Sequence, residues 1–138
     1  MDSAIDVRRI AGSETIDLRH RVMWPDAPRK HVILEGDEEA LHYGAFFEGG
    51  LVGVGSFFVD DKRVRLRKMA VDVQCQGRGI ASRLLSVAMD DLRASGFHEI
   101  WCDARTSALN FYRKNGFSID TKTFQKHGLD YVIATRVF

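Results

Sequence analysis

The central part of the chain has a strand-like run of apolar residues followed by apolar residues at helical spacing. The change between these two patterns predicts where a strand ends and a helix begins. A run of apolar and β-branched residues over positions 66–73 predicts a strand. Apolar residues then recur at helical spacing between Ile80 and Leu92, which predicts a helix with one buried face. This helix should end near Ser95 and Gly96, because glycine readily adopts the left-handed conformation that closes many helices.

The rest of the chain predicts further short elements on both sides of this unit. Gly49 and Gly50 mark a hairpin turn, and Ser13 is a candidate helix cap. Two prolines place a loop over residues 23–30, whereas residues 31–40 show no clear period. The predicted strands are residues 5–10, 41–47, 51–59, 64–73, 99–104, 117–123 and 131–137; the predicted helices are residues 14–22, 80–95 and 107–114; a loop over residues 125–130 joins the last two strands.

Composition and charge favour one folded domain over residues 1–138. Hydrophobic residues make up 45% of the chain and charged residues 28%, as in folded proteins. The net charge of +1 gives no basic footprint for nucleic acid. No apolar stretch has the length of a membrane span, and the polar first residues do not resemble a signal peptide. Cys75 and Cys102 give neither a disulfide framework nor metal-ligand spacing, so we expect a cytoplasmic protein without a metal.

The glycine turn between the central strand and helix is a candidate anion site. Gln76-Gly77-Arg78-Gly79 separates the two elements, and small residues let a phosphate approach the backbone closely. The first turn of the following helix offers unpaired N–H groups and the positive end of its dipole. The alternative is a tight turn that merely needs glycine. Neither GK[ST] nor G-x-G-x-x-G is present, so the two common nucleotide-binding motifs are absent.

Residues 76–81 read Q-x-x-G-x-A, and in this the sequence resembles the GNAT N-acetyltransferase superfamily, whose signature is [QR]-x-x-G-x-[GA]. The resemblance implies an α/β (α+β) fold: a single GNAT-like domain with a mixed, mostly antiparallel sheet of six to seven strands, flanked by helices and splayed between residues 64–73 and 99–104. It also implies acetyl-coenzyme A as cosubstrate. The implied cofactor-binding residues are Met69, Ala70, Val71, Gln76, Gly77, Arg78, Gly79, Ile80, Ala81, Ser82, Arg105 and Phe111.

A second motif supports the same resemblance. Residues 108–117 match the family pattern A-x-x-[FL]-Y-x-x-x-G-F. In relatives this tyrosine lies near the thioester sulfur, which implies that Tyr112 is the general acid, since a phenol with a pKa of about 10 is protonated at neutral pH. The alternative is a core tyrosine on an amphipathic helix. Many relatives have asparagine seven residues earlier, where this chain has Arg105; either Arg105 replaces that contact or the contact is lost.

The resemblance implies an N-acetyltransferase that uses direct attack by a primary amine of a small-molecule acceptor, in a ternary complex. Backbone N–H groups near Met69 and Val71 would polarise the acetyl carbonyl. The general base is unassigned: Glu35, His42 and Glu48 are candidates, and His42 is favoured by the ordinary pKa of imidazole.

Two other functions stay open, namely a non-catalytic acyl-coenzyme A binding module and an acetyltransferase for protein N-termini or lysines. We expect no nucleic acid or membrane partner, and a monomer or a homodimer. In the family, the segment with His20, Arg21 and Trp24 forms part of the acceptor wall; Trp24 either lines the pocket or is a hydrophobic plug. The strand face with Arg63, Arg65 and Arg67 is either solvated or binds an acidic substrate or the cofactor 3′-phosphate.

Overall fold

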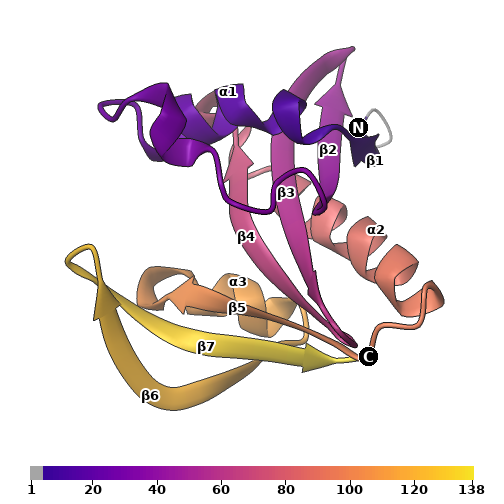
Figure 1. Cartoon of the computed structure of the whole chain (residues 1–138), viewed down its shortest axis with the longest axis vertical. Coiled ribbons are helices and arrows are strands. Elements are labelled where there is room, and N and C mark those ends of the chain that lie inside the picture. The colour runs from indigo at the N-terminus through magenta and orange to yellow at the C-terminus, as the bar shows by residue number, and fades with distance from the viewer. Residues whose placement is uncertain (1–4) are drawn as a thin grey trace.

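Seven strands form a single sheet in the computed structural model, which describes residues 5–138 (Figure 1). The spatial order is β1-β2-β3-β4-β5-β7-β6, and every neighbouring pair is antiparallel except β4 and β5, which are parallel. The strands are β1 Ile5–Ile10, β2 Leu41–Phe47, β3 Gly50–Asp60, β4 Arg63–Val71, β5 Glu99–Arg105, β6 Ser118–Lys126 and β7 Leu129–Val137. This arrangement confirms the predicted mixed, mostly antiparallel sheet.

The helices cover both faces of the sheet. The longest is α2, Ile80–Ala94, and it ends before Gly96 at φ 94°, as predicted. The first helical segment consists of a 3-10 turn Gly12–Thr15, α1 Ile16–Leu18 and a π-helical turn Arg19–Met23. The remaining helical segments are the 3-10 turns Arg29–Val32, Val73–Cys75 and Thr106–Ala108, and α3 Leu109–Lys114.

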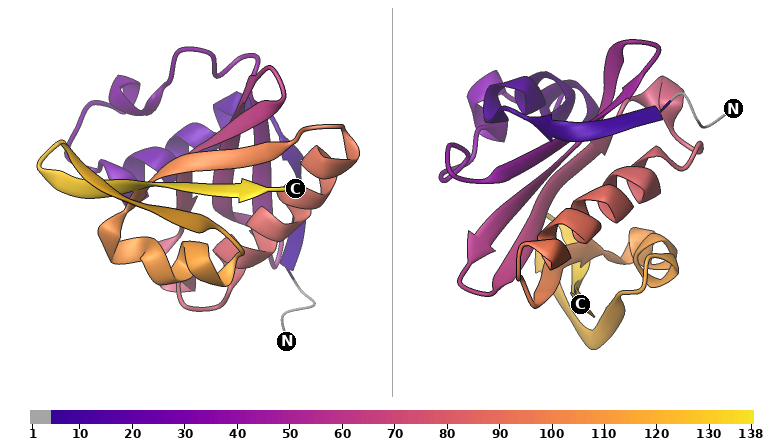
Figure 2. Two further views of the ribbon diagram at one scale, coloured as in Figure 1. Left: turned by 90° about the horizontal axis from the view of Figure 1, so that it is seen from below. Right: turned by 90° about the vertical axis from the view of Figure 1, so that its right-hand side faces the viewer.

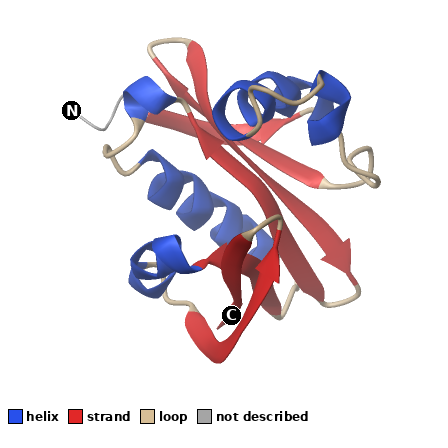
Figure 3. Cartoon of the chain, turned by 90° about the vertical axis from the view of Figure 1, so that its left-hand side faces the viewer, coloured by secondary structure: helices blue, strands red, loops and turns tan. Residues whose placement is uncertain are grey.

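Two clusters of buried residues hold these layers together. Leu84, Leu85 and Ala88 of α2 are fully buried in the main cluster, together with residues of β2 to β5 and β7. Leu18 of the first helical segment belongs to a smaller cluster with Val54 and Ala70. The first helical segment and α2 therefore lie on opposite faces of β3 and β4 (Figures 2 and 3).

The structure corrects three of the predicted boundaries. The first helical segment begins at Gly12, not after Ser13, and the Glu14 carboxylate accepts a hydrogen bond from the N–H of the preceding Ala11 at 2.7 Å. β4 ends at Val71 rather than at residue 73, because the next residue caps a 3-10 turn. The loop predicted at residues 125–130 is a tight turn around His127 and Gly128, both at positive φ, as tight hairpins require.

β4 and β5 pair only at one end. Three residue pairs join them, from Arg63–Glu99 to Arg65–Trp101, and beyond this point the two strands diverge (Figure 1). β4 remains paired to β3, and β5 to β7, so the facing edges of β4 and β5 lose their ladder where they separate. The predicted splay is thus confirmed, and it leaves backbone polar groups that need partners.

No helix within residues 5–138 has the length and apolar composition needed to cross a membrane.

Candidate active site

The turn between β4 and α2 leaves the first amides of α2 open. Gly79 is the N-cap at φ 76° and Gly77 is at φ 81°, a region that glycine adopts without strain. No side chain among residues 5–138 caps this end, and the first turn of α2 contains no acidic residue. A Cβ atom at either glycine would meet no other atom within 4 Å. Because the first N–H groups of a helix have no intrahelical partner, this uncrowded end can bind an anion.

Side chains around the turn hold it in place without closing it. Gln76 Nε2 donates a hydrogen bond to the carbonyl oxygen of Val71 at 3.1 Å, which ties the turn to the end of β4. Ile80 is buried in the core, so only its backbone faces the turn. Arg78 is exposed, with its guanidinium carbon 5.9 Å from the centre of the Phe47 ring.

The first turn of α2 is also joined to the end of α3. Asn115 Nδ2 donates to Ser82 Oγ at 3.2 Å and to the carbonyl oxygen of Phe111 at 2.8 Å. Asn115 and Gly116 form an Asn-Gly pair, which in a sequence is a common helix stop signal and does not reveal this contact. Ala81 is half-buried, and Phe111 packs on the main core. The two motifs found in the sequence are therefore neighbours in the fold.

A pocket of about 590 Å³ opens where β4 and β5 separate. Four parts of the chain contribute: β4, the end of β5 with the start of α3, the β6–β7 hairpin, and the segment after α1. The pocket is lined by Val22, Met23, Trp24, His31, Leu34, Arg65, Leu66, Arg67, Lys68, Met69, Cys102, Asp103, Arg105, Ala108, Tyr112, Lys126, His127 and Tyr131.

Several residues predicted for the site line this pocket, and others do not. Met69, Arg105, Tyr112 and Trp24 do, so Trp24 is a wall residue and not only a plug. The predicted cofactor residues outside the pocket lining are Ala70, Val71, Gln76, Gly77, Arg78, Gly79, Ile80, Ala81, Ser82 and Phe111. Most of these follow the splay, at the end of β4 and the start of α2.

The three candidate bases all lie outside the pocket lining. Glu35 and Glu48 are exposed turn residues. His42 is only 2% exposed: one ring nitrogen contacts Ser56 Oγ at 2.8 Å and the other contacts the carbonyl oxygen of Asp37 at 2.7 Å. The preference for His42 is therefore not supported by its position, because both of its ring nitrogens already have partners inside the fold.

The Tyr112 hydroxyl is held in its protonated form. Burial raises the pKa of Tyr112 far above its usual value, and the neighbouring Cys102 thiol raises it further. Burial likewise raises the pKa of Cys102 to about 12. The ring is fixed by edge-to-face contacts with Phe111 and Phe117, with centroids 5.1 Å and 5.3 Å away. Tyr112 is thus a rigid pocket residue that carries its proton at neutral pH.

An unpredicted β-bulge shapes the wall that β4 contributes. Val54 faces Ala70 and Ser56 faces Arg67, so Lys68 and Met69 together oppose a single residue of β3. Lys68 is at φ 57°, a left-handed conformation that is strained for a residue with a side chain. Bulges re-aim side chains that would otherwise alternate between the two faces. Both residues of the bulge, Lys68 and Met69, line the pocket, and so does the preceding Arg67.

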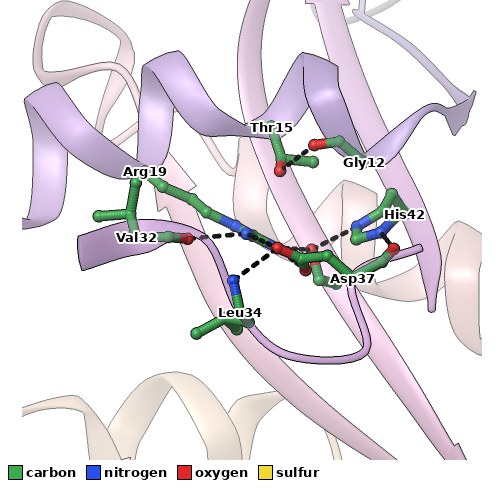
Figure 4. A network of polar contacts seen from close by, with 8 residues as sticks. Gly12, Thr15, Arg19, Val32, Leu34, Asp37 and His42 are labelled. Atoms are coloured by element: carbon green, nitrogen blue, oxygen red, sulfur yellow. Dashed lines mark hydrogen bonds and ion pairs between the residues drawn. The ribbon is translucent and has the colours of Figure 1, made fainter. Parts of the chain in front are cut away.

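A buried polar network (Figure 4) supports the part of the pocket wall that contains His31 and Leu34. Arg19 is fully buried and binds both carboxylate oxygens of Asp37, at 2.8 Å and 2.9 Å. It also donates to the carbonyl oxygen of Val32 and to Ser56 Oγ. Asp37 in turn accepts from the N–H of Leu34 at 2.8 Å. The network fixes the segment that carries His31 and Leu34, which both line the pocket.

Comparison with known proteins identifies the family. The sequence profile of the acetyltransferase (GNAT) family matches residues 8–117. The chain is 28% identical over 122 residues to the uncharacterized N-acetyltransferase YitI of Bacillus subtilis (strain 168), an alignment that covers 82% of each protein. The chain therefore belongs to the acetyltransferase (GNAT) family; it is an acyltransferase, and the cosubstrate of this family is acetyl-coenzyme A.

Solved structures agree on the fold. The ribosomal-protein-S18-alanine N-acetyltransferase of Escherichia coli is 17% identical with a TM-score of 0.81, over 96% of this chain and 93% of that one. A GNAT family acetyltransferase from Elizabethkingia anophelis, solved with acetyl-CoA bound, is 17% identical with a TM-score of 0.78, over 98% and 99% of the two chains.

Proposed function

We propose that the protein transfers the acetyl group of acetyl-coenzyme A to the primary amine of a small-molecule acceptor, by direct attack in a ternary complex. The observation that carries this proposal is the pocket at the splay of β4 and β5, which has a protonated phenol in its wall. The open end of α2 follows the same strand. Diphosphate, thioester and acceptor can thus be bound along one continuous path.

Each part of this path has a distinct role in the proposed reaction. The amides at Gly77 and Gly79 bind the diphosphate. The acceptor nitrogen forms a bond to the acetyl carbon while backbone N–H groups near Met69 and Val71 stabilise the developing oxyanion. As the carbon–sulfur bond breaks, Tyr112 gives its proton to the departing sulfur, and the proton that the acetylated nitrogen then loses restores the phenol.

The substrate ammonium must first lose a proton, and the pocket offers two imidazoles for this step. His31 and His127 both line the pocket, and imidazole is the side chain that most often serves as a general base. Asp103, the one carboxylate that the described residues contribute to the lining, already binds Arg65 and Lys126. We therefore propose His31 and His127, in place of His42, as the candidates to test as the base.

A small acceptor fits the pocket better than a polypeptide does. Trp24 makes edge-to-face contacts with His31, at 4.8 Å between ring centres, and with His127, at 5.8 Å. Because His127 lies in the β6–β7 turn, this cluster bridges two distant parts of the chain across one side of the pocket. A polypeptide acceptor needs an open groove, and the contacts of Trp24 with His31 and His127 would obstruct such a groove on this side of the pocket.

A thermal-shift comparison tests the cosubstrate site. Acetyl-coenzyme A should raise the melting temperature, by an amount that corresponds to about 2.7 kcal/mol at a concentration of 100 times Kd. NAD and ATP should raise it less. Release of free thiol with a panel of amines then tests turnover. Binding without turnover of any amine would favour a non-catalytic acyl-coenzyme A module, and no shift at all would contradict the proposed site.

Replacing Tyr112 with phenylalanine should lower kcat by about 100-fold, which is the lower range of general acid catalysis. The KM for acetyl-coenzyme A should change far less, because the hydroxyl acts on the leaving group. Steady-state kinetics at saturating amine measure both constants. An unchanged kcat would remove Tyr112 from the mechanism.

Tyr43→Phe is the matched control for that substitution. The Tyr43 hydroxyl donates to Asp91 at 2.8 Å and lies outside the pocket lining. This variant should lose stability, by about 1 kcal/mol for one hydrogen bond, but it should keep its kcat. The two variants thus separate loss of a catalytic proton from loss of a structural hydroxyl.

A further inference from the structure

The pocket concentrates positive charge in a protein that is almost neutral. The net charge of the whole chain is +1. The described part of the chain nevertheless contributes five Lys or Arg side chains and one carboxylate to the pocket lining. The basic residues are Arg65, Arg67, Lys68, Arg105 and Lys126, and the carboxylate is Asp103. This excess is therefore a property of the site and not of the surface as a whole.

Asp103 already forms ion pairs with two of these basic residues. Asp103 Oδ2 accepts from Arg65 Nη2 at 2.7 Å and from Lys126 Nζ at 2.8 Å. Among residues 5–138, neither Arg67 nor Lys68 forms an ion pair or a side-chain hydrogen bond. Their contacts are with rings: the Arg67 guanidinium carbon lies 5.5 Å from the centre of the Phe58 ring, and Lys68 Nζ lies 6.0 Å from the centre of the Trp24 ring.

Arg67 and Lys68 are also partly removed from water. Both are half-buried. Burial is the largest cause that lowers the pKa of Lys68, followed by the charges of Arg67, Arg19 and Lys126. Burial likewise lowers the pKa of Arg67, together with the charge of Arg65. Placing two adjacent cations partly out of water without an anionic partner costs free energy. A bound anion would offset this cost by pairing with both charges.

Lys68 connects this pair to the segment of Trp24, which in the family is part of the acceptor wall. Lys68 lies over Trp24, which also lines the pocket. The amides proposed for the cosubstrate diphosphate lie elsewhere, beyond Val71 and outside the pocket lining. The backbone of Lys68 is strained, and strained residues concentrate at binding and catalytic sites. The strain therefore supports a role for Lys68 in binding.

We propose that the acceptor is a primary amine that also carries an anionic group, a carboxylate or a phosphate, and that Arg67 and Lys68 bind this group. The inference rests on the proposed function and names its substrate class. Binding the acid at Arg67 and Lys68 would leave the amine free to reach the thioester between β4 and β5. Arg65 and Lys126, which share the Asp103 carboxylate, would form the surrounding wall.

The test uses acceptors in pairs that differ only in the anionic group. One pair is 4-aminobutyrate and its amide, and the other is phosphoethanolamine and ethanolamine; the two pairs separate carboxylate from phosphate. The anionic member should have a kcat/KM at least about tenfold higher, as expected for hydrogen bonds to a charged group. Thiol release at saturating acetyl-coenzyme A measures this ratio.

Substitutions then assign the preference to the pair. Lys68→Met and Arg67→Gln should each reduce the preference for the anionic member by about tenfold and raise its KM, without changing the KM for acetyl-coenzyme A. Lys68→Arg should retain the preference. Lys122→Met is the matched control, since it removes the same charge from β6 outside the pocket lining and should behave as the wild type. Circular dichroism shows whether each variant is folded.

The outcomes separate this inference from the proposed function. Turnover of the neutral members at equal or higher kcat/KM would overturn the inference and leave the acetyltransferase proposal intact. A raised KM for acetyl-coenzyme A in both Lys68→Met and Arg67→Gln would also overturn it, because the cations would then serve the cosubstrate phosphates. Absence of turnover with any amine would count against both the inference and the proposed function. A thermal shift would then show whether acetyl-coenzyme A still binds.

Discussion

Replacing Gly79 with glutamate should abolish the binding of acetyl-coenzyme A, with a loss of more than about 100-fold in affinity. The proposed diphosphate would face the N–H groups at the start of α2, where the surroundings of Gly79 are open. A glutamate would put bulk and a negative charge at this end, and a like charge next to a ligand costs several kcal/mol. Isothermal titration calorimetry measures the loss directly.

Gly96→Glu is the control that keeps the backbone strain and the added charge but moves them to the other end of α2. Gly96 is at φ 94° and its surroundings are equally open. Both variants should lose about 1–2 kcal/mol of stability, because a side chain is strained in this region. Gly96→Glu should nevertheless bind acetyl-coenzyme A as the wild type does. Retained affinity in Gly79→Glu would refute the proposed diphosphate site.

The sequence was sufficient to predict the features of the fold that depend on local pattern. The helical period of α2 and Gly96 predicted that helix and its end, and alternation predicted the strands to within a few residues. The two spaced motifs indicated the family, and with it the splay between β4 and β5. These features are encoded by residues that are close together in the chain, or by motifs long enough to be specific.

The features that shape the pocket were not predictable in this way. The bulge at Lys68 depends on how β4 pairs with β3, and the residues of β4 alone do not predict it. Asp103 became important only because the fold brings Arg65 and Lys126 to the same oxygen of its carboxylate. His42 had the right chemistry for a base but points into a buried network, since alternation alone does not say which face of an inner strand meets the pocket.

Replacing Arg19 with methionine should lower the free energy of unfolding by about 3–5 kcal/mol, because it leaves the buried Asp37 carboxylate without its partner. The total stability of such a domain is about 5–15 kcal/mol, so the change should be large in urea denaturation. Arg21→Met is the matched control. Arg21 pairs with Asp17 and Asp72 at the exposed surface, with its side chain 45% accessible, and such pairs contribute at most about 1 kcal/mol.

The pH dependence of the Arg19→Met effect gives an independent check. Although burial alone would raise the pKa of Asp37, the hydrogen bonds from Arg19 and from the N–H of Leu34 outweigh it and lower the pKa below 3.8. A carboxylate with a lowered folded-state pKa contributes its stability above the unfolded-state value and loses it as the pH falls through the folded-state value. The stability difference between wild type and Arg19→Met should therefore be full near pH 6 and shrink below about pH 4. A difference that is independent of pH would show that Arg19 stabilises the fold by packing alone, and not through Asp37.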